Sequence, residues 1–208
     1  QALRKSTEIS LIVHCFGEER VDAIGYETPT ELIHSNPAIA AVATDLAIAN
    51  ALTNVDVVHT HTWYATMAGH IASLIHGIPH IMSGHSLEPL RPWKAEQLGG
   101  GYKLSSWIEK TAIENAAAVI AVSDGMRTDI LSAYPNVDPF RVHTIRNGVD
   151  TKKFSPHCDP SVLAKYGISG RYGLFVGRIT RQKGLAHLLR AWKEVPSEYG
   201  LVIAAGSP

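Results

Sequence analysis

The 208-residue chain has no excess of charge of either sign, because Lys plus Arg and Asp plus Glu both total 19. Proteins that are drawn to nucleic acid or to an anionic membrane carry a basic excess, so we expect neither as a main partner. An anionic ligand would have to be held locally by a few placed groups. No apolar run approaches the roughly 20 residues of a membrane span, and the opening QALRKSTEIS is not typical of a secretory signal.

Cysteine is equally scarce. Cys15 and Cys158 are the only two, and neither belongs to a CxxC or a Cys–His finger pattern. A disulfide framework is therefore not predicted, and a reducing, cytoplasmic setting is the natural interpretation. Hydrophobic residues make up 45% of the chain and charged residues 18%, a composition typical of globular proteins of one or two domains. Nothing in the sequence sets the oligomeric state.

Short apolar runs alternate with longer helical stretches. The runs are continuous, which is typical of strands buried in a parallel sheet. The predicted strands are Ile9–Phe16, Val55–His59, His80–Ser83, Ala118–Val122, Val142–Ile145, Gly173–Val176 and Leu201–Ala205, and the predicted helices are Ala38–Leu52, Trp63–His76, Tyr102–Asn115, Asp124–Ala133 and Leu185–Glu194. This order predicts an α/β fold of doubly wound, Rossmann-like sheets.

A domain boundary is predicted within Asn147–Asp150, where a completed strand gives way to polar and turn-forming residues. We expect an N-terminal Rossmann-like domain over residues 1–148. Residues 149–208 are too few for a second doubly wound domain, so they predict only its first part. The chain starts without Met and stops directly after an apolar run, and we expect it to be truncated at both ends.

The segment LFVGRITRQKGLAHLL predicts an anion site. A strand ends at Gly177, a basic loop follows with Arg178 and Lys183, and a helix begins after Gly184. Ligands of open α/β sheets bind at the carboxyl ends of strands. Arg grips phosphate through paired hydrogen bonds and Lys adds a point charge. The alternative is a solvated basic loop without a ligand.

Three histidines follow two predicted strands. His59 and His61 stand at the end of one strand and His85 at the end of the next. His-x-His at a strand end is found in metal-dependent hydrolases, so a metal site built from these three is one hypothesis. No Asp-rich or Glu-rich partner cluster follows. The favoured interpretation is therefore that one histidine is a hydrogen-bonded core residue and the other lines a cleft, with no metal.

After His85 comes a long loop that mixes charges with an aromatic. It contains Glu88, Arg91, Trp93, Lys94 and Glu96, followed by three glycines. Long loops at the carboxyl end of a strand often carry function, and this composition suits recognition of sugars and phosphates. A surface lid that contacts nothing is the alternative.

Five segments together resemble a known family. They are VVHTHTWY, GHSLEPLRPWKAEQLGGGYKLSSWIE, AVIAVSDGMR, IRNGVD and FVGRITRQKG, in this order and over nearly the whole chain. They are similar to the family-four glycosyltransferases, which have the two-domain GT-B fold. The SLEPLRPWKAEQLGGGY stretch is the narrowest of these signals, and it resembles the actinobacterial type of glycogen or maltose-1-phosphate synthase.

The resemblance implies a function and a set of site residues. The reaction would be retaining transfer of glucose from ADP-glucose to glucose 1-phosphate or an α-1,4-glucan, without a metal or other cofactor. The implied roles are neutralisation of the donor diphosphate by Arg178 and Lys183, close approach at Gly177, a position near the donor sugar for His85, and weaker acceptor-side roles for His61, Arg91, Lys94 and Gln97.

Two parts of the family pattern lie outside this chain. They are the glycine-rich loop after the first strand and a later segment whose paired glutamates contact the donor. We therefore expect the 208-residue piece alone to be inactive. A protein that only binds nucleotide sugar or glucan is the non-enzymatic alternative, and another nucleotide sugar as donor is a further one.

Overall fold

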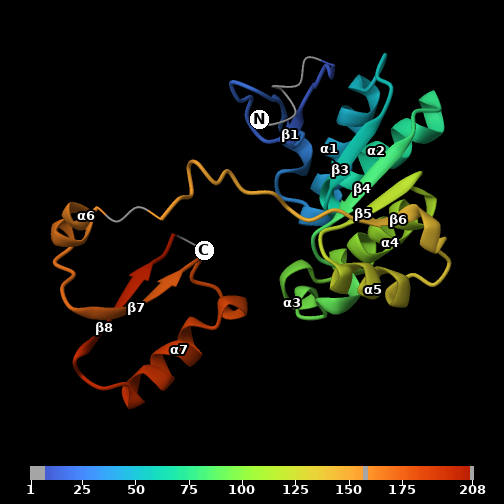
Figure 1. The fold of residues 1–208 in the computed structure, drawn as a ribbon. Helices are drawn as coiled ribbons and strands as arrows, with labels where there is room; N and C mark the ends of the chain where they lie inside the picture. The colour runs from blue at the N-terminus through green and yellow to red at the C-terminus, as the bar shows by residue number, and fades with distance from the viewer. Residues whose placement is uncertain (1–7, 157–158, 207–208) are drawn as a thin grey trace. The chain divides into compact units, whose positions relative to one another are not determined.

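The computed structural model describes residues 8–156 and 159–206 (Figure 1). The chain divides into two compact units, residues 1–148 and residues 149–208, and each has its own parallel sheet. Cys15 is a half-buried free thiol, whereas Cys158, the second of the two predicted free cysteines, lies outside the described residues.

The core of the first unit is a four-stranded parallel sheet. Its strands are β3 (Val58–His61), β4 (His80–Gly84), β5 (Ala118–Ala121) and β6 (Val142–Thr144), in the order β3-β4-β5-β6. The register pairs His61 with Ser83 and Gly84 with Ala121. The carboxyl ends of the strands therefore meet at one edge of the sheet, which is where open α/β sheets bind ligands.

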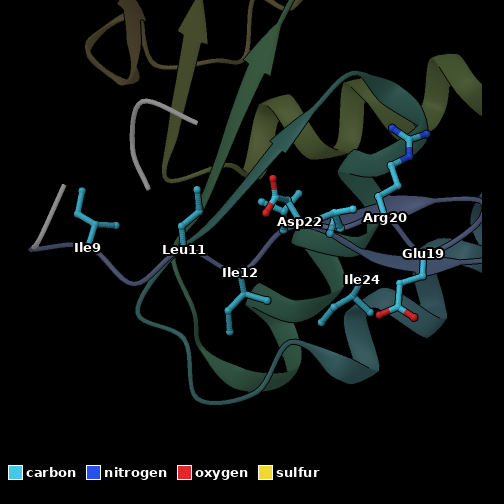
Figure 2. A pocket seen from close by; sticks show the side chains of 10 residues that line it. Ile9, Leu11, Ile12, Glu19, Arg20, Asp22 and Ile24 are labelled. Carbon is cyan, nitrogen blue, oxygen red and sulfur yellow. The ribbon is translucent and has the colours of Figure 1, made fainter. Parts of the chain in front are cut away.

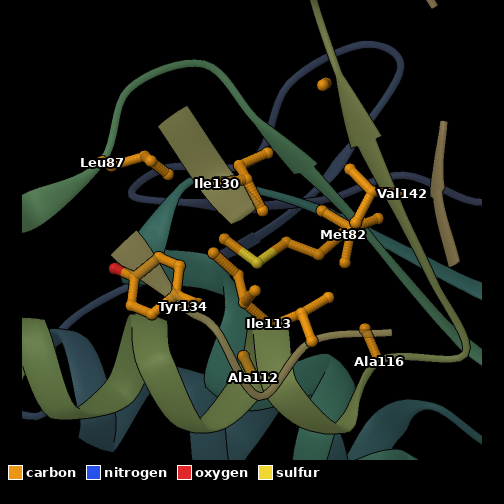
Figure 3. Close-up of a cluster of buried hydrophobic side chains, with 11 residues drawn as sticks. Met82, Leu87, Ala112, Ile113, Ala116, Ile130, Tyr134 and Val142 are labelled. Carbon is orange, nitrogen blue, oxygen red and sulfur yellow. The ribbon is translucent and has the colours of Figure 1, made fainter. Parts of the chain in front are cut away.

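The connecting helices cover one face of this sheet. They are α2 (Trp63–His76), α4 (Gly101–Asn115) and α5 (Asp124–Ala133), and each links two neighbouring strands (Figure 1). Right-handed crossovers between strands in sequential order place all such helices on the same side. Met82, Val119 and Val142 point to this side and form a buried cluster with residues of α4 and α5 (Figure 3).

The other face of the sheet is less covered in the described part of the chain. His59 and His61 on β3 and His143 on β6 are exposed there, and Ile81 and Ile120 are only half-buried. Because successive side chains of a strand alternate between faces, the two histidines of β3 lie opposite the helices, whereas Thr60 between them faces α2.

Local signals explain where the helices start and stop. Asn36 caps α1 (Pro37–Ala51) by accepting a 3.0 Å hydrogen bond from the Ala38 amide, and Ser123 caps α5 in the same way. Helix α2 ends at Gly77, whose φ of 67° favours glycine. Helix α1 packs on α2 and adds two apolar clusters to the core.

Three short elements precede α1. Strands β1 (His14–Phe16) and β2 (Ile24–Tyr26) form a separate two-stranded parallel sheet, and the 3-10 turn η2 (Thr30–Leu32) follows.

The long loop after β4 contains the 3-10 turn η3 (Glu88–Leu90) and the short helix α3 (Lys94–Leu98). A further turn, η4 (Pro139–Arg141), leads into β6.

The second unit starts with helix α6 (Pro160–Lys165) and contains the parallel strands β7 (Arg171–Val176) and β8 (Tyr199–Ala204). Between the strands lie the turn η5 (Arg181–Lys183), the helix α7 (Leu185–Ala191) and the turn η6 (Trp192–Glu194). A Cβ at Gly173 would lie 2.4 Å from the Trp192 ring. Only glycine therefore lets this ring pack directly on β7.

The α/β fold with parallel sheets is confirmed, and so are most of the predicted elements. Helices α2 and α5 have the predicted bounds. The predicted strand Ile9–Phe16 is wrong over most of its length, because only His14–Phe16 pairs with another strand. The predicted strand Val55–His59 is shifted, since pairing begins at Val58 and continues through His61. Strand β2 and helices α3 and α6 were missed.

Candidate functional site

Three histidines gather at the carboxyl edge of the four-stranded sheet. His61 Nδ1 lies 2.9 Å from His85 Nε2, so one ring donates a hydrogen bond to the other. The same two rings stack at 5.3 Å, and the His59 and His61 rings lie 4.4 Å apart. His59 Nε2 is hydrogen-bonded to Ser83 Oγ at 2.8 Å. The sequence placed these histidines at neighbouring strand ends, and the structure brings all three into contact.

The surroundings of the cluster disfavour positive charge. Partial burial lowers the pKa of His59 and His61, and nearby histidines lower it further: His85 for His59, and both His59 and His85 for His61. At neutral pH these two rings are therefore mainly uncharged. A neutral His61 ring that shares Nδ1 with His85 keeps its other nitrogen to donate to, or accept from, a sugar hydroxyl.

The geometry does not support the metal-dependent hydrolase. Within residues 8–156 and 159–206, no group of three or more His, Cys, Asp or Glu side chains is placed to hold a metal ion. The nitrogens of His61 and His85 are turned toward each other, and His59 is bonded to Ser83. His59 is hydrogen-bonded as predicted for one of the histidines, but it is exposed and is not a core residue.

The loop after β4 is fixed at its start by two buried residues, Leu87 and Glu88, each 1% exposed. Leu87 belongs to the core cluster of Figure 3. The Glu88 carboxylate accepts hydrogen bonds from Lys94 Nζ at 2.9 Å and from Ser105 Oγ at 2.7 Å. The loop is therefore hydrogen-bonded to α4, so the alternative of a surface lid that contacts nothing is wrong.

A second carboxyl group lies beside Glu88. Glu109 Oε1 accepts the Glu88 amide at 2.7 Å and the Tyr134 hydroxyl at 2.5 Å. Burial is the main cause that raises the pKa of Glu109 to about 7, against the lowering effect of these two hydrogen bonds. The Tyr134 pKa is raised as well, first by burial and then by the charge of Glu109.

The predicted acceptor-side residues divide into two kinds. The Lys94 ammonium is bonded to Glu88 and lies 5.5 Å above the centre of the Trp63 ring, so it is engaged within the protein. Arg91 is half-buried, and its Nη1 donates to Ser86 Oγ at 2.9 Å while its Nε has no partner among the described residues. Gln97 is exposed on α3. Arg91, Gln97 and the exposed His61, which is bonded to His85 through Nδ1 alone, are the predicted acceptor-side residues that remain open to a ligand.

In the second unit, the predicted phosphate loop follows β7. Arg178 and Lys183 are exposed, and neither makes an ion pair within the described ranges 8–156 and 159–206. A Cβ at Gly177 would meet the Lys183 Cδ at 3.9 Å, so the lysine stem runs past this glycine. Gly184, with a φ of 69°, ends the turn η5 in a conformation that favours glycine. The predicted anion site therefore has both of its cations exposed beside the end of β7.

A hollow in the surface of the first unit lies elsewhere. It has a volume of about 570 Å³ and is lined by apolar residues such as Leu11, Ile12 and Ile24 together with Arg20 and Asp22 (Figure 2). None of the residues that the sequence singled out lines it. The hollow is therefore not evidence for the site at the strand edge.

Sequence reasoning missed Ser83, Glu109 and Tyr134. Ser83 was interpreted only as the last residue of a predicted strand. Glu109 lies inside helix α4, and Tyr134 directly follows helix α5. A buried carboxyl within a helix leaves no periodic signal, because its partners come from distant segments. Glu109 lies 21 residues from Glu88 and 25 from Tyr134 in the chain.

Comparison with known proteins gives one consistent result. The model of Glycosyltransferase Family 4 matches residues 2–153. The chain is 51% identical to the alpha-maltose-1-phosphate synthase of Mycolicibacterium smegmatis over 99% of its own length and 54% of that protein. It is 49% identical to the protein of the same name from Mycobacterium tuberculosis, over 94% of this chain and 52% of that one. The chain thus spans about half the length of these curated relatives.

Solved structures agree on the fold. A sucrose-phosphate synthase from Thermosynechococcus elongatus has a TM-score of 0.69 at 18% identity and covers 89% of this chain and 47% of its own. The Anabaena protein HepE, solved with UDP and glucose, has a TM-score of 0.65 at 19% identity over 88% of this chain and 47% of its own. None of the helices in the described part of the chain combines the length and the apolar character that a membrane crossing requires.

Proposed function

Because the chain belongs to glycosyltransferase family 4, we propose that the protein containing it is a retaining hexosyltransferase that moves glucose from ADP-glucose to glucose 1-phosphate or an α-1,4-glucan. The supporting observation is the identity of about 50%, over nearly the whole chain, to two proteins named alpha-maltose-1-phosphate synthase. A cytoplasmic location and the absence of a metal or other cofactor stay predictions.

The second unit would bind the donor. Arg178 and Lys183 place two positive charges beside the end of β7, and a departing nucleoside diphosphate gains negative charge as the glycosidic bond breaks. Fixed cations that face developing charge stabilise a transition state more than a ground state. We assign these two residues to the leaving diphosphate, and Gly177 to the close approach of the backbone.

The first unit would hold the reacting sugars. His85 stands at the edge of the sheet with its ring oriented by His61, and we assign it to the donor sugar. Arg91 and Gln97 lie on the following loop, where an acceptor phosphate or sugar hydroxyl can be bound; Lys94 supports this loop through Glu88. Transfer then depends mainly on positioning and charge stabilisation. Because the chain spans only about half the length of its two named relatives, we propose that the 208-residue piece alone is inactive.

The test is a transfer assay on the full-length protein that contains this chain. ADP-glucose, UDP-glucose and GDP-glucose are offered in turn as donors, with glucose 1-phosphate or glycogen as acceptor. We expect transfer with ADP-glucose, and about a 100-fold or larger loss of kcat in Arg178→Ala and Lys183→Ala, the scale measured when one transition-state donor is removed.

Arg190→Ala is the matched control, because Arg190 is an exposed cation in the last turn of α7, outside the loop. It is expected to keep the activity. Equal losses in all three variants would assign the effect to net charge rather than to the loop. Absence of transfer from every donor would refute the proposed function.

A further inference from the structure

The start of the loop after β4 is a fixed point of the first unit. We call Leu87 and Glu88 the anchor. All four polar atoms of Glu88 are hydrogen-bonded: its amide to Glu109, its carbonyl to the Tyr102 hydroxyl at 2.7 Å and the Arg91 amide at 2.9 Å, and its carboxylate to Lys94 and Ser105. A buried residue with every polar atom bonded has one position only.

The anchor controls two of the three proposed substrate-binding side chains of the first unit, those of His85 and Arg91. His85 and Ser86 are the only residues between the end of β4 at Gly84 and the anchor. Arg91 is bonded to Ser86 through its side chain and to Glu88 through its amide. A shift of Glu88 would therefore move His85 and Arg91 together.

The anchor is itself held from the opposite side by α4 and α5. Glu109, in the middle of α4, accepts the Glu88 amide, and Tyr134, at the end of α5, donates to the same carboxylate oxygen. Glu109 and Tyr134 are 1% and 2% exposed. If the Glu109 carboxyl is removed, both donors remain buried without an acceptor, and relieving that requires the loop to move.

We propose that Glu109, oriented by Tyr134, is a positioning residue for sugar transfer: by binding the Glu88 amide it sets the backbone that carries His85 and Arg91. This inference rests on the proposed function. Glu109 does not touch the substrates, and it acts only through the anchor. Tyr134 shares the role because its hydroxyl fixes the carboxylate oxygen that Glu88 uses.

The placement of charge supports this role over a purely structural one. Glu88 and Glu109 are two buried carboxyl groups that share one ammonium, that of Lys94. Apolar residues of similar volume often stabilise a protein as well as such a group does. The acidic pair is placed where the loop leaves the core, and there it determines a backbone position that apolar packing would leave free.

The experiment compares variants of the full-length protein. Glu109→Leu removes the acceptor, Glu109→Gln keeps one oxygen that can accept both hydrogen bonds, and Tyr134→Phe removes one donor. Ile48→Ala is the control, because Ile48 lies in a core cluster of α1, α2 and β3 that contains no residue of the loop. For each variant kcat and KM are measured for donor and acceptor, together with the unfolding midpoint and the amide exchange of residues 85–91.

We expect Glu109→Leu to lose about 10-fold to 100-fold in kcat/KM for the acceptor, the range that a displacement of about 1 Å can cause. Because His85 is assigned to the donor sugar, kcat falls whichever substrate is varied, whereas the KM for the nucleotide sugar stays within about twofold, since the proposed function assigns its diphosphate to the second unit. Glu109→Gln restores most of the activity, and Tyr134→Phe lies between the two. Ile48→Ala is less stable but has normal kcat and KM at temperatures below its unfolding transition.

Glu109→Leu with wild-type kinetics, or a loss no greater than that of Ile48→Ala at equal stability, would overturn the proposal. If Glu109→Leu does not fold, the same comparison is made with Tyr134→Phe. If the wild-type protein shows no transfer, the proposed function fails, and amide exchange decides the positioning role separately. Faster exchange of residues 85–91 in both variants supports it, and unchanged exchange refutes it.

Discussion

Asp45 gives the first unit a stability that depends on pH. It lies on α1 with 0% exposure, and neither carboxylate oxygen has a hydrogen-bond partner within the described residues. The carboxyl faces the α2 backbone at Met67 and Ala68, whose amides give it only weak support. Burial outweighs this support and raises the Asp45 pKa from 3.8 to about 8. The folded protein therefore keeps Asp45 protonated at neutral pH.

The sign follows from proton binding. Between pH 4 and pH 8 the folded state holds a proton on Asp45 that the unfolded state has lost, so the free energy of unfolding falls as pH rises. The difference of about four pH units corresponds to at most about 6 kcal/mol, at about 1.4 kcal/mol per unit. Water entry and small movements reduce this, and we expect a measured effect of about 2–5 kcal/mol.

The perturbation is Asp45→Asn, which keeps the shape of the side chain and removes its titration. The free energy of unfolding is measured by urea denaturation at half-unit steps from pH 4 to pH 9. We expect the stability of the variant relative to wild type to increase steadily from pH 4 to pH 8 and then to level off. The constant cost of burying the Asn amide cancels in this slope. A difference that does not change with pH would refute the protonated Asp45.

Three further predictions concern packing, helix ends and acid stability. Gly69→Val should lower the free energy of unfolding by about 2–4 kcal/mol, because even a Cβ at Gly69 would lie 2.5 Å from the His80 ring. Thermal unfolding measures this loss. Gly77→Asn is the control, since Gly77 is at an open position with a left-handed backbone. Arg141→Ala should lower the free energy of unfolding by about 1–3 kcal/mol, since Nη1 and Nη2 of Arg141 donate to the Ala116 and Glu114 carbonyls at the end of α4. An unchanged midpoint of urea unfolding would contradict this prediction. Burial, and after it the charges of His70 and His59, lower the pKa of His80 to about 4. As pH falls from 6.5 to 4 the unfolded state binds a proton that the folded state does not, so His80→Gln should lose less stability than the wild type. Stability curves of the two proteins that stay parallel over this range would argue against a neutral buried His80.

The parts of the fold that the sequence predicted are those determined by local pattern. Helix α2 has the predicted bounds because its apolar periodicity ends at Gly77 and Pro79, and α5 begins at the Ser123 cap as expected. The observed strand β3 lies further along the chain than the predicted one because it includes the polar residues Thr60 and His61. These two pair with β4, whereas the prediction relied on apolar composition. Register depends on a partner strand whose paired residues lie 22 positions further along the chain, and no local pattern contains that information.

The candidate site was predictable at the strand ends and unpredictable within the helices. His59, His61 and His85 follow apolar runs, and parallel strands bring their carboxyl ends together. The engagement of Lys94 by Glu88 and the role of Glu109 could not be predicted, because they depend on how α3 and α4 fold back on the loop. The phosphate assignment of Arg178 and Lys183 stays a prediction from motif and exposure.

The central claim, that this chain belongs to a glucose-transferring enzyme that uses ADP-glucose, is tested most directly by identifying the product. The full-length protein is incubated with ADP-glucose and glucose 1-phosphate, and the product is analysed by proton and phosphorus NMR. We expect ADP and a disaccharide phosphate whose new linkage is an α-1,4 bond. A β-linked product, free glucose from hydrolysis, or intact ADP-glucose would contradict it.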